Sequence, residues 1–171
     1  MSASAPVVLV SGAARRIGAA IASRLHADGA AVVLHCHRSR AAAEALAAEL
    51  DARAPGRTCV VQADLVDAAG FPALVDAAVA RFGRLDALVN NAAAFAPTAF
   101  EATDAEAFDA LMATNARAPF LLAQAAAPHL RAARGAIVNI GDLYAERPRA
   151  DLVAYAASKA ALPTLPASSR T

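Results

Sequence analysis

The stretch PVVLVSGAARRIGAAIASRLHADGAAVVLHC, residues 6–36, decides the fold class. Short runs of branched apolar residues open and close it, and an alanine-rich segment with helical spacing lies between them. Strands that are continuously apolar, rather than alternately apolar and polar, are buried on both faces, as in a parallel sheet covered by helices. Residues 6–36 therefore predict a strand, a helix and a second, parallel strand.

The same alternation continues along the chain. Strands are predicted at residues 6–10, 31–35, 58–62, 85–89 and 136–140. Helices are predicted at residues 16–28, 39–53, 71–82, 103–133 and 151–162. Pro119 and Pro128 are expected to bend or divide the fourth helix. Repeated strand–helix units with right-handed crossovers predict an α/β fold with a doubly wound parallel sheet, in a single domain over residues 1–171.

Composition argues against several classes of partner. The 171 residues include 16 basic and 15 acidic side chains, whereas nucleic-acid and membrane surfaces need a clustered excess of one sign. No apolar run approaches the ~18 residues of a membrane helix, and the N-terminal sequence lacks the pattern of a secretion signal. Cys36 and Cys59 lie in predicted strands and are expected to be free, buried thiols. We therefore expect a cytoplasmic protein with no nucleic-acid, membrane or metal ligand.

The turn after the first strand carries two glycines. Gly12 can adopt backbone angles closed to other residues, and Gly18 allows the helix to pack close to the sheet. The N-terminus of that helix offers free N–H groups and a partial positive charge to a phosphate. Such a turn is sometimes purely structural, but its place after the first strand of an alternating pattern favours nucleotide binding.

The segment HCHRSR, residues 35–40, ends the second predicted strand. A carboxylate there would bind a ribose 2′-hydroxyl and select NAD. Instead, His37, Arg38, Ser39 and Arg40 supply donors and positive charge, which suits a 2′-phosphate and predicts NADP(H). The alternative is a solvated basic start of the next helix, although a helix N-terminus disfavours cations.

Two more polar segments follow predicted strands. QADL (62–65) carries Asp64, which is placed to meet an adenine edge, and NNAAAF (90–95) follows the fourth strand. Open α/β sheets bind ligands at the carboxyl ends of their strands, where both segments lie. Asparagine pairs also occur in ordinary turns.

Tyr155 and Lys159 project from one face of the last predicted helix, because they are four residues apart. A phenol titrates near ~10. The Lys159 ammonium and an oxidised nicotinamide are expected to lower the pKa of Tyr155, and Lys159 is expected to bond the nicotinamide ribose. The spacing alone also occurs by chance on helix surfaces.

SGAARRIG, QADL, NNAA, Asn115 in LMATN and Tyr155-x-x-x-Lys159 together resemble the short-chain dehydrogenase/reductase family, from about residue 6 to 162. The resemblance implies a Rossmann-type fold and an NADPH-dependent oxidoreductase. The cofactor contacts that it implies are Gly12, Arg16, Ile17, Gly18, His37, Arg38, Ser39, Asp64, Leu65, Asn91, Ala92 and Lys159.

Within this family the chain most resembles the pteridine reductases. Arg16 stands where most family members have glycine, and HCHRS and NNAAAFAPT resemble the 2′-phosphate loop and the pterin-stacking stretch of these enzymes. Asp142 lies thirteen residues before Tyr155, where other members carry a catalytic serine. The resemblance implies hydride transfer from NADPH to a dihydropterin- or dihydrofolate-like substrate.

The resemblance also assigns roles to side chains. Asp142 and Tyr155 deliver protons to the substrate, and Asn115 holds a water of the proton relay in a bend of the long helix. The substrate contacts that it implies are Arg16, Ala93, Phe95, Asp142 and Tyr155. Each has a plainer alternative: Asp142 as the cap of a turn, Phe95 as a core residue and Asn115 as an exposed helical residue.

Two features depart from the pteridine reductases. Ala93 and Ala94 replace serines, so a hydroxyl contact to the pterin is lost. Pro163 and Pro166 interrupt the last helix, and the tail 163–171 is unlike the family. The resemblance implies a longer helix and two further strands, so we expect a C-terminally truncated chain with an exposed fifth strand and poor catalytic efficiency.

Two other functions compete with a pteridine reductase. One is a short-chain carbonyl reductase of other specificity, and the other is an inactive, truncated nucleotide-binding fragment. The resemblance implies a homodimer or homotetramer if the chain folds.

Overall fold

The structure is a computed structural model that describes residues 5–97 and 99–165. Its centre is a parallel sheet of five strands in the order β3-β2-β1-β4-β5. The strands are β1 (Val7–Val10), β2 (Ala31–Cys36), β3 (Thr58–Gln62), β4 (Ala87–Asn90) and β5 (Ala136–Asn139). The order reverses between β1 and β4, which confirms the predicted doubly wound, Rossmann-type fold.

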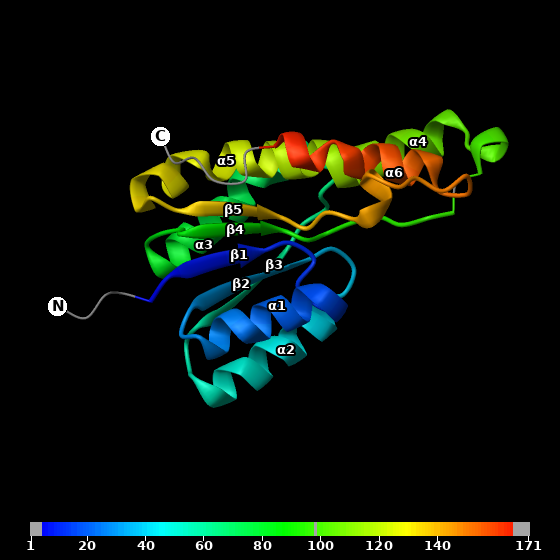
Figure 1. Cartoon of the computed structure of the whole chain (residues 1–171). Coiled ribbons are helices and arrows are strands. Elements are labelled where there is room, and N and C mark those ends of the chain that lie inside the picture. Colours follow the sequence, from blue (N-terminus) through cyan, green and yellow to red (C-terminus); the bar gives the residue numbers. More distant parts are fainter. Residues whose placement is uncertain (1–4, 98, 166–171) are drawn as a thin grey trace.

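Helices cover both faces of the sheet (Figure 1). The longer ones are α1 (Arg16–Ala27), α2 (Arg40–Arg53), α3 (Phe71–Phe82), α4 (Ala105–Met112), α5 (Ala118–Ala133) and α6 (Val153–Ala160). The short ones are the 3₁₀-helices η1 (Ala68–Gly70), η2 (Phe100–Ala102), η4 (Leu143–Ala145) and η5 (Leu162–Thr164), and the π-helix η3 (Ala113–Arg117).

The core has two layers because successive strand residues face opposite sides. Leu9 and Val33 pack with α3 and α5, whereas Val10 and Val32 pack with α1 and α2. All residues of β1 and β2 are buried. This two-sided burial explains why these strands are continuously apolar in sequence.

The predicted helix 103–133 divides at the π-helix η3, which ends two residues before Pro119, in agreement with a division near that proline. The chain stays helical from η3 into α5, and Pro119 has no N–H to donate to the carbonyl of Asn115 in the preceding turn. Pro128 lies inside α5 without ending it. Pro128 and Gln124 are both exposed, so the Gln124 carbonyl that loses its helical donor faces solvent.

β5 is the outer strand of the sheet within residues 5–97 and 99–165, and Val138 on it is 47% exposed. α6 ends at Ala160, and Pro163 lies in η5, in agreement with a break near that proline. Pro166 and the polar tail fall outside the described residues. No helix in the described part of the chain is long and apolar enough to cross a membrane.

Both cysteines are free. Cys36 is buried as expected, but Cys59 is only partly buried because β3 is the other outer strand of the sheet. Burial raises the pKa of both thiols.

Candidate active site

A cleft of ≈ 620 Å³ opens at the carboxyl ends of the strands. It is within the range of small-molecule sites. Every residue predicted as a cofactor contact, except Lys159, lines this cleft. The topology therefore brings together segments as distant in sequence as Gly12 and Asn91.

The glycine turn forms a cradle that side chains would fill. Gly12 has φ +64°, and a Cβ there would lie 2.9 Å from the Cα of Ala92. A Cβ at Gly18 would lie 2.2 Å from the Gly12 carbonyl oxygen. The start of α1 consequently lies against the turn, with Arg16 exposed at its first position.

A buried serine ties this turn to the end of β4. Ser11 Oγ accepts the N–H groups of Asn91 and Ala92 at 2.9 and 3.0 Å. The Asn91 amide donates to the carbonyls of Ser11 and Gly12 at 2.9 and 3.1 Å. Asn91 thus holds the wall of the cleft with its side chain. Sequence reasoning missed Ser11, although a polar residue directly after a buried strand was a usable signal.

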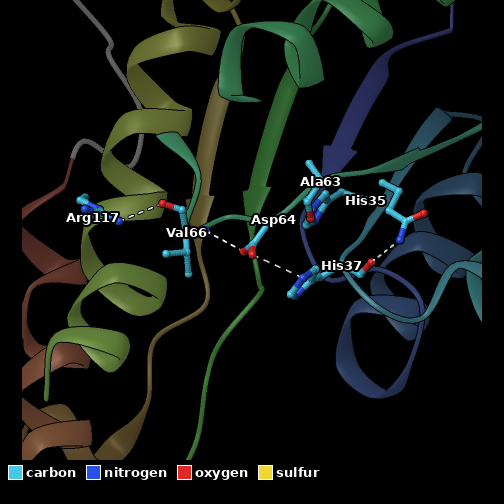
Figure 2. Close-up of polar contacts among 7 residues, drawn as sticks. His35, His37, Ala63, Asp64, Val66 and Arg117 are labelled. Carbon is cyan, nitrogen blue, oxygen red and sulfur yellow. Dashed lines mark hydrogen bonds and ion pairs between the residues drawn. The ribbon is translucent and has the colours of Figure 1, made fainter. Parts of the chain in front are cut away.

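The loop predicted to bind a 2′-phosphate is open to solvent. Figure 2 shows Asp64, in the segment after β3, between His37 of this loop and Val66: its Oδ2 lies 3.5 Å from His37 Nε2, and its Oδ1 accepts the N–H of Val66. Arg38 and Ser39 line the cleft beside them. Arg40 does not line it, because its guanidinium binds Glu44 one turn along α2 at 2.7 Å.

Asp142 and Tyr155 form a second cluster. The Tyr155 hydroxyl donates to Asp142 Oδ2 at 2.6 Å, and Asp142 Oδ1 accepts the Tyr144 N–H at 3.0 Å. Asp142 therefore caps η4, which agrees with the alternative given for it in the sequence analysis, and it also binds the Tyr155 phenol. The Phe95 ring meets that of Tyr155 edge-on, with centroids 4.9 Å apart, yet is 62% exposed. An exposed ring is not a core residue.

Lys159 and Asn115 are buried beside this cluster. The Lys159 ammonium donates to the Ile140 carbonyl at 3.1 Å. Asn115, in the π-helix η3, accepts the Ala94 N–H at 2.8 Å and donates to the Ala94 carbonyl and to Ser158 Oγ, both at 2.9 Å. Asn115 therefore links η3, the loop after β4 and α6, and it is not an exposed helical residue.

Comparison with known proteins identifies the family. The profile of the short chain dehydrogenases matches residues 6–170. The chain belongs to the short-chain dehydrogenase family. Members of this family are oxidoreductases that bind NAD or NADP.

Three relatives illustrate the breadth of this similarity. Pteridine reductase 1 of Leishmania tarentolae is 38% identical in an alignment that covers 94% of this chain and 69% of the relative. An uncharacterized oxidoreductase of Methylorubrum extorquens is 39% identical, covering 91% and 62%. L-fucose dehydrogenase of Mus musculus is 36% identical, covering 93% and 56%. The chain thus spans between about half and two thirds of these relatives' lengths.

The charge state of this short-chain dehydrogenase site differs from the sequence-based expectation. The pKa of Tyr155 is raised, first by burial and then by its hydrogen bond to the Asp142 carboxylate. The prediction that the Tyr155 pKa is lowered was wrong when only the chain's own groups are considered. It counted the Lys159 ammonium and left out the Asp142 carboxylate.

The pKa of Asp142 is lowered, because it accepts the Tyr144 N–H and the Tyr155 hydroxyl. Burial lowers the pKa of Lys159, and Asp142 opposes this shift. At neutral pH the cluster therefore holds a neutral phenol against an ionised carboxylate, with a buried ammonium nearby.

Proposed function

We propose that this short-chain dehydrogenase transfers hydride from NADPH to a pterin of the dihydropterin or dihydrofolate class. The observation that carries the proposal is the 2.6 Å hydrogen bond from Tyr155 to Asp142. A carboxylate at this position marks the pteridine reductases in the resemblance, and the similarity to Pteridine reductase 1 of Leishmania tarentolae supports the same substrate class.

The residues of the cleft suit a dinucleotide. The cradle at Gly12 and Gly18 leaves room for a pyrophosphate against backbone, where a side chain would clash. Arg16 would bind the pyrophosphate, and His37, Arg38 and Ser39 would bind a ribose 2′-phosphate. No carboxylate occupies positions 37–40, so NADP(H) is favoured over NAD(H).

When bound, NADPH supplies the hydride, and the chain supplies the proton that a reduced ring nitrogen needs. Tyr155 holds that proton on its hydroxyl at neutral pH, because burial and Asp142 raise its pKa. A phenolate beside an ionised carboxylate is unfavourable. A proton from solvent that reaches the Tyr155 oxygen through Asp142 would restore the hydroxyl once Tyr155 has released its own, which makes the two side chains a single proton-donating unit.

The exposed Phe95 ring offers a flat apolar face next to this unit. A pterin stacked on Phe95 would lie next to Tyr155, because the two aromatic rings are in contact. Ala93 lines the cofactor cleft and leaves its backbone for a substrate contact.

A substrate panel with the full chain tests the proposal. NADPH oxidation is followed with dihydrobiopterin, dihydrofolate, simple ketones and, in reverse with NADP⁺, L-fucose. Selective oxidation with the pterins supports the proposal. Selective turnover of ketones or fucose assigns another specificity, and NADPH binding without turnover of any substrate assigns a nucleotide-binding chain without activity.

A further inference from the structure

A histidine beneath the cofactor cleft binds two segments of its wall. His35 is the last but one residue of β2 and is 1% exposed. Its Nδ1 lies 3.2 Å from the Gly12 backbone nitrogen, and its Nε2 lies 3.1 Å from the Ala63 carbonyl oxygen. The His35 carbonyl also accepts the Ala13 N–H at 2.8 Å.

These partners determine the protonation state of the imidazole. The Gly12 N–H is only a donor, so Nδ1 has to carry a lone pair. The Ala63 carbonyl is only an acceptor, so Nε2 has to carry the hydrogen. Both hydrogen bonds can form together only when the imidazole is neutral and carries its proton on Nε2.

Both bonds shape the cleft. Gly12 stands in the left-handed conformation at the turn against which the pyrophosphate would lie. Ala63 immediately precedes Asp64, on the predicted adenine side, and its own N–H donates to the Cys36 carbonyl at 3.1 Å. The imidazole therefore joins the ends of β1, β2 and β3, three segments that surround one ligand.

We propose that His35 is a positioning residue for the dinucleotide: its neutral imidazole holds the glycine turn and the adenine wall in register, and its protonation releases the turn. This inference rests on the proposed binding of NADP(H). His35 touches no reacting atom, so its loss weakens cofactor binding more than it slows the chemical step.

Burial favours the neutral form. It lowers the pKa of His35, and the hydrogen bond to the Ala63 carbonyl opposes this shift. Of the neighbouring charges, His37 lowers the pKa and Asp64 raises it. The other cations that line the cleft are Arg15 and Arg16 from the start of α1 and Arg38 from the loop after β2. Because the folded pKa is below the unfolded value, the stability that neutral His35 contributes is present at neutral pH and is lost as pH falls through the unfolded pKa towards the folded one.

The test compares four variants by NADPH titration. His35→Phe keeps a ring but loses both bonds, and we expect its dissociation constant to rise about tenfold, the scale of one or two buried hydrogen bonds. His35→Asn keeps an acceptor for Gly12 and should recover part of that loss, whereas His35→Gln keeps only the donor for Ala63 and should recover less. His26→Phe is the matched control, because His26 is 3% exposed, its Nε2 has no hydrogen-bond partner among residues 5–97 and 99–165, and it does not line the cleft.

A pH series separates positioning from general packing. Between about pH 7 and about pH 5 the wild type should lose affinity for NADP⁺ more steeply than His35→Asn, which cannot titrate at this position. Equal slopes, or a His35→Phe protein that folds and binds NADPH as tightly as wild type, would overturn the inference. If His35→Phe does not fold, tighter binding by His35→Gln than by His35→Asn overturns it. Failure of the wild type to bind NADPH would instead reject the cofactor assignment.

Discussion

The two halves of the sheet hold their functional groups in different ways: β1, β2 and β3 with the turns that follow them form the β2 side, and β4, β5 and α6 form the β5 side. On the β2 side, the cleft is built from backbone, with β1 and β2 buried along their whole length and turns tied by Ser11 and His35. On the β5 side, the site is built from side chains that meet at a partly exposed edge, where Phe95 is 62% exposed. We therefore expect changes on the first side to alter cofactor affinity and changes on the second to alter turnover.

Tyr155→Phe should have the largest effect, and it should lower turnover without changing the cofactor cleft on the β2 side. The ring and its packing remain, but the hydroxyl that donates to Asp142 is lost. Pterin-dependent oxidation of NADPH should fall roughly 10²–10⁴-fold, the usual contribution of general acid catalysis. The NADPH dissociation constant of the same variant, measured by fluorescence titration, should stay at the wild-type value. Retention of most of the wild-type rate would exclude Tyr155 as the proton donor.

Gly18→Ala should disrupt the glycine turn of the cofactor cleft on the β2 side. The new Cβ would lie 2.2 Å from the Gly12 carbonyl oxygen and 2.6 Å from Asn91 Nδ2, so the turn has to move. We expect a loss of about 1–3 kcal/mol in the free energy of unfolding and a clear loss of NADPH affinity. Gly70→Ala is the control, since no atom of the described part of the chain lies within 4 Å of the corresponding Cβ position. Equal denaturation midpoints for the two variants would show that the turn is not close-packed.

Asp142→Asn sharpens the comparison by isolating one charge. Without the carboxylate, the pKa of Tyr155 should fall, because the hydrogen bond to Asp142 and its negative charge both raise it. The chain has two tyrosines and no tryptophan. In a Tyr144→Phe background, the phenolate absorbance therefore reports Tyr155 alone. An unchanged or higher midpoint in Asp142→Asn would contradict the proposed coupling of the two groups.

These differences explain what the sequence could predict. Parallel strands end at one edge of a sheet, so glycines and polar residues that follow buried runs meet there, and the lining of the cleft could be inferred without coordinates. The sign of the Tyr155 pKa shift could not, because it depends on the Asp142 contact, which η4 and α6 create together. His35 was missed because it continues an apolar strand, and its partners, Gly12 and Ala63, are distant in sequence.

Asn115→Ala tests how the β5 side is held together. The amide satisfies both backbone groups of Ala94 and binds Ser158 Oγ. Its loss removes the partner of both part-buried backbone groups of Ala94, while Ser158 Oγ keeps its hydrogen bond to the Tyr155 carbonyl, and it should cost about 1–3 kcal/mol of unfolding free energy. Gln124→Ala, on the exposed side of α5, should have almost no effect. A similar urea midpoint for both variants would argue against Asn115 as the link between η3 and α6.

Arg117→Ala should have the smallest effect, and it tests whether the β5 side influences cofactor binding on the β2 side. Arg117 in η3 donates to the Val66 carbonyl at 2.9 Å, the Val66 N–H donates to Asp64, and Asp64 lies beside His37 (Figure 2). This run of contacts connects the π-helix to the predicted 2′-phosphate loop. Because the Arg117 bond is exposed, its loss should change the free energy of unfolding by no more than about 0.5 kcal/mol.

The NADPH dissociation constant of Arg117→Ala should likewise stay near the wild-type value, since Asp64 keeps its Val66 and His37 contacts. A large loss of NADPH affinity with unchanged unfolding would mean that η3 positions the cofactor loop through Arg117. The separation of affinity on the β2 side from turnover on the β5 side would then be wrong, and the π-helix would belong to both.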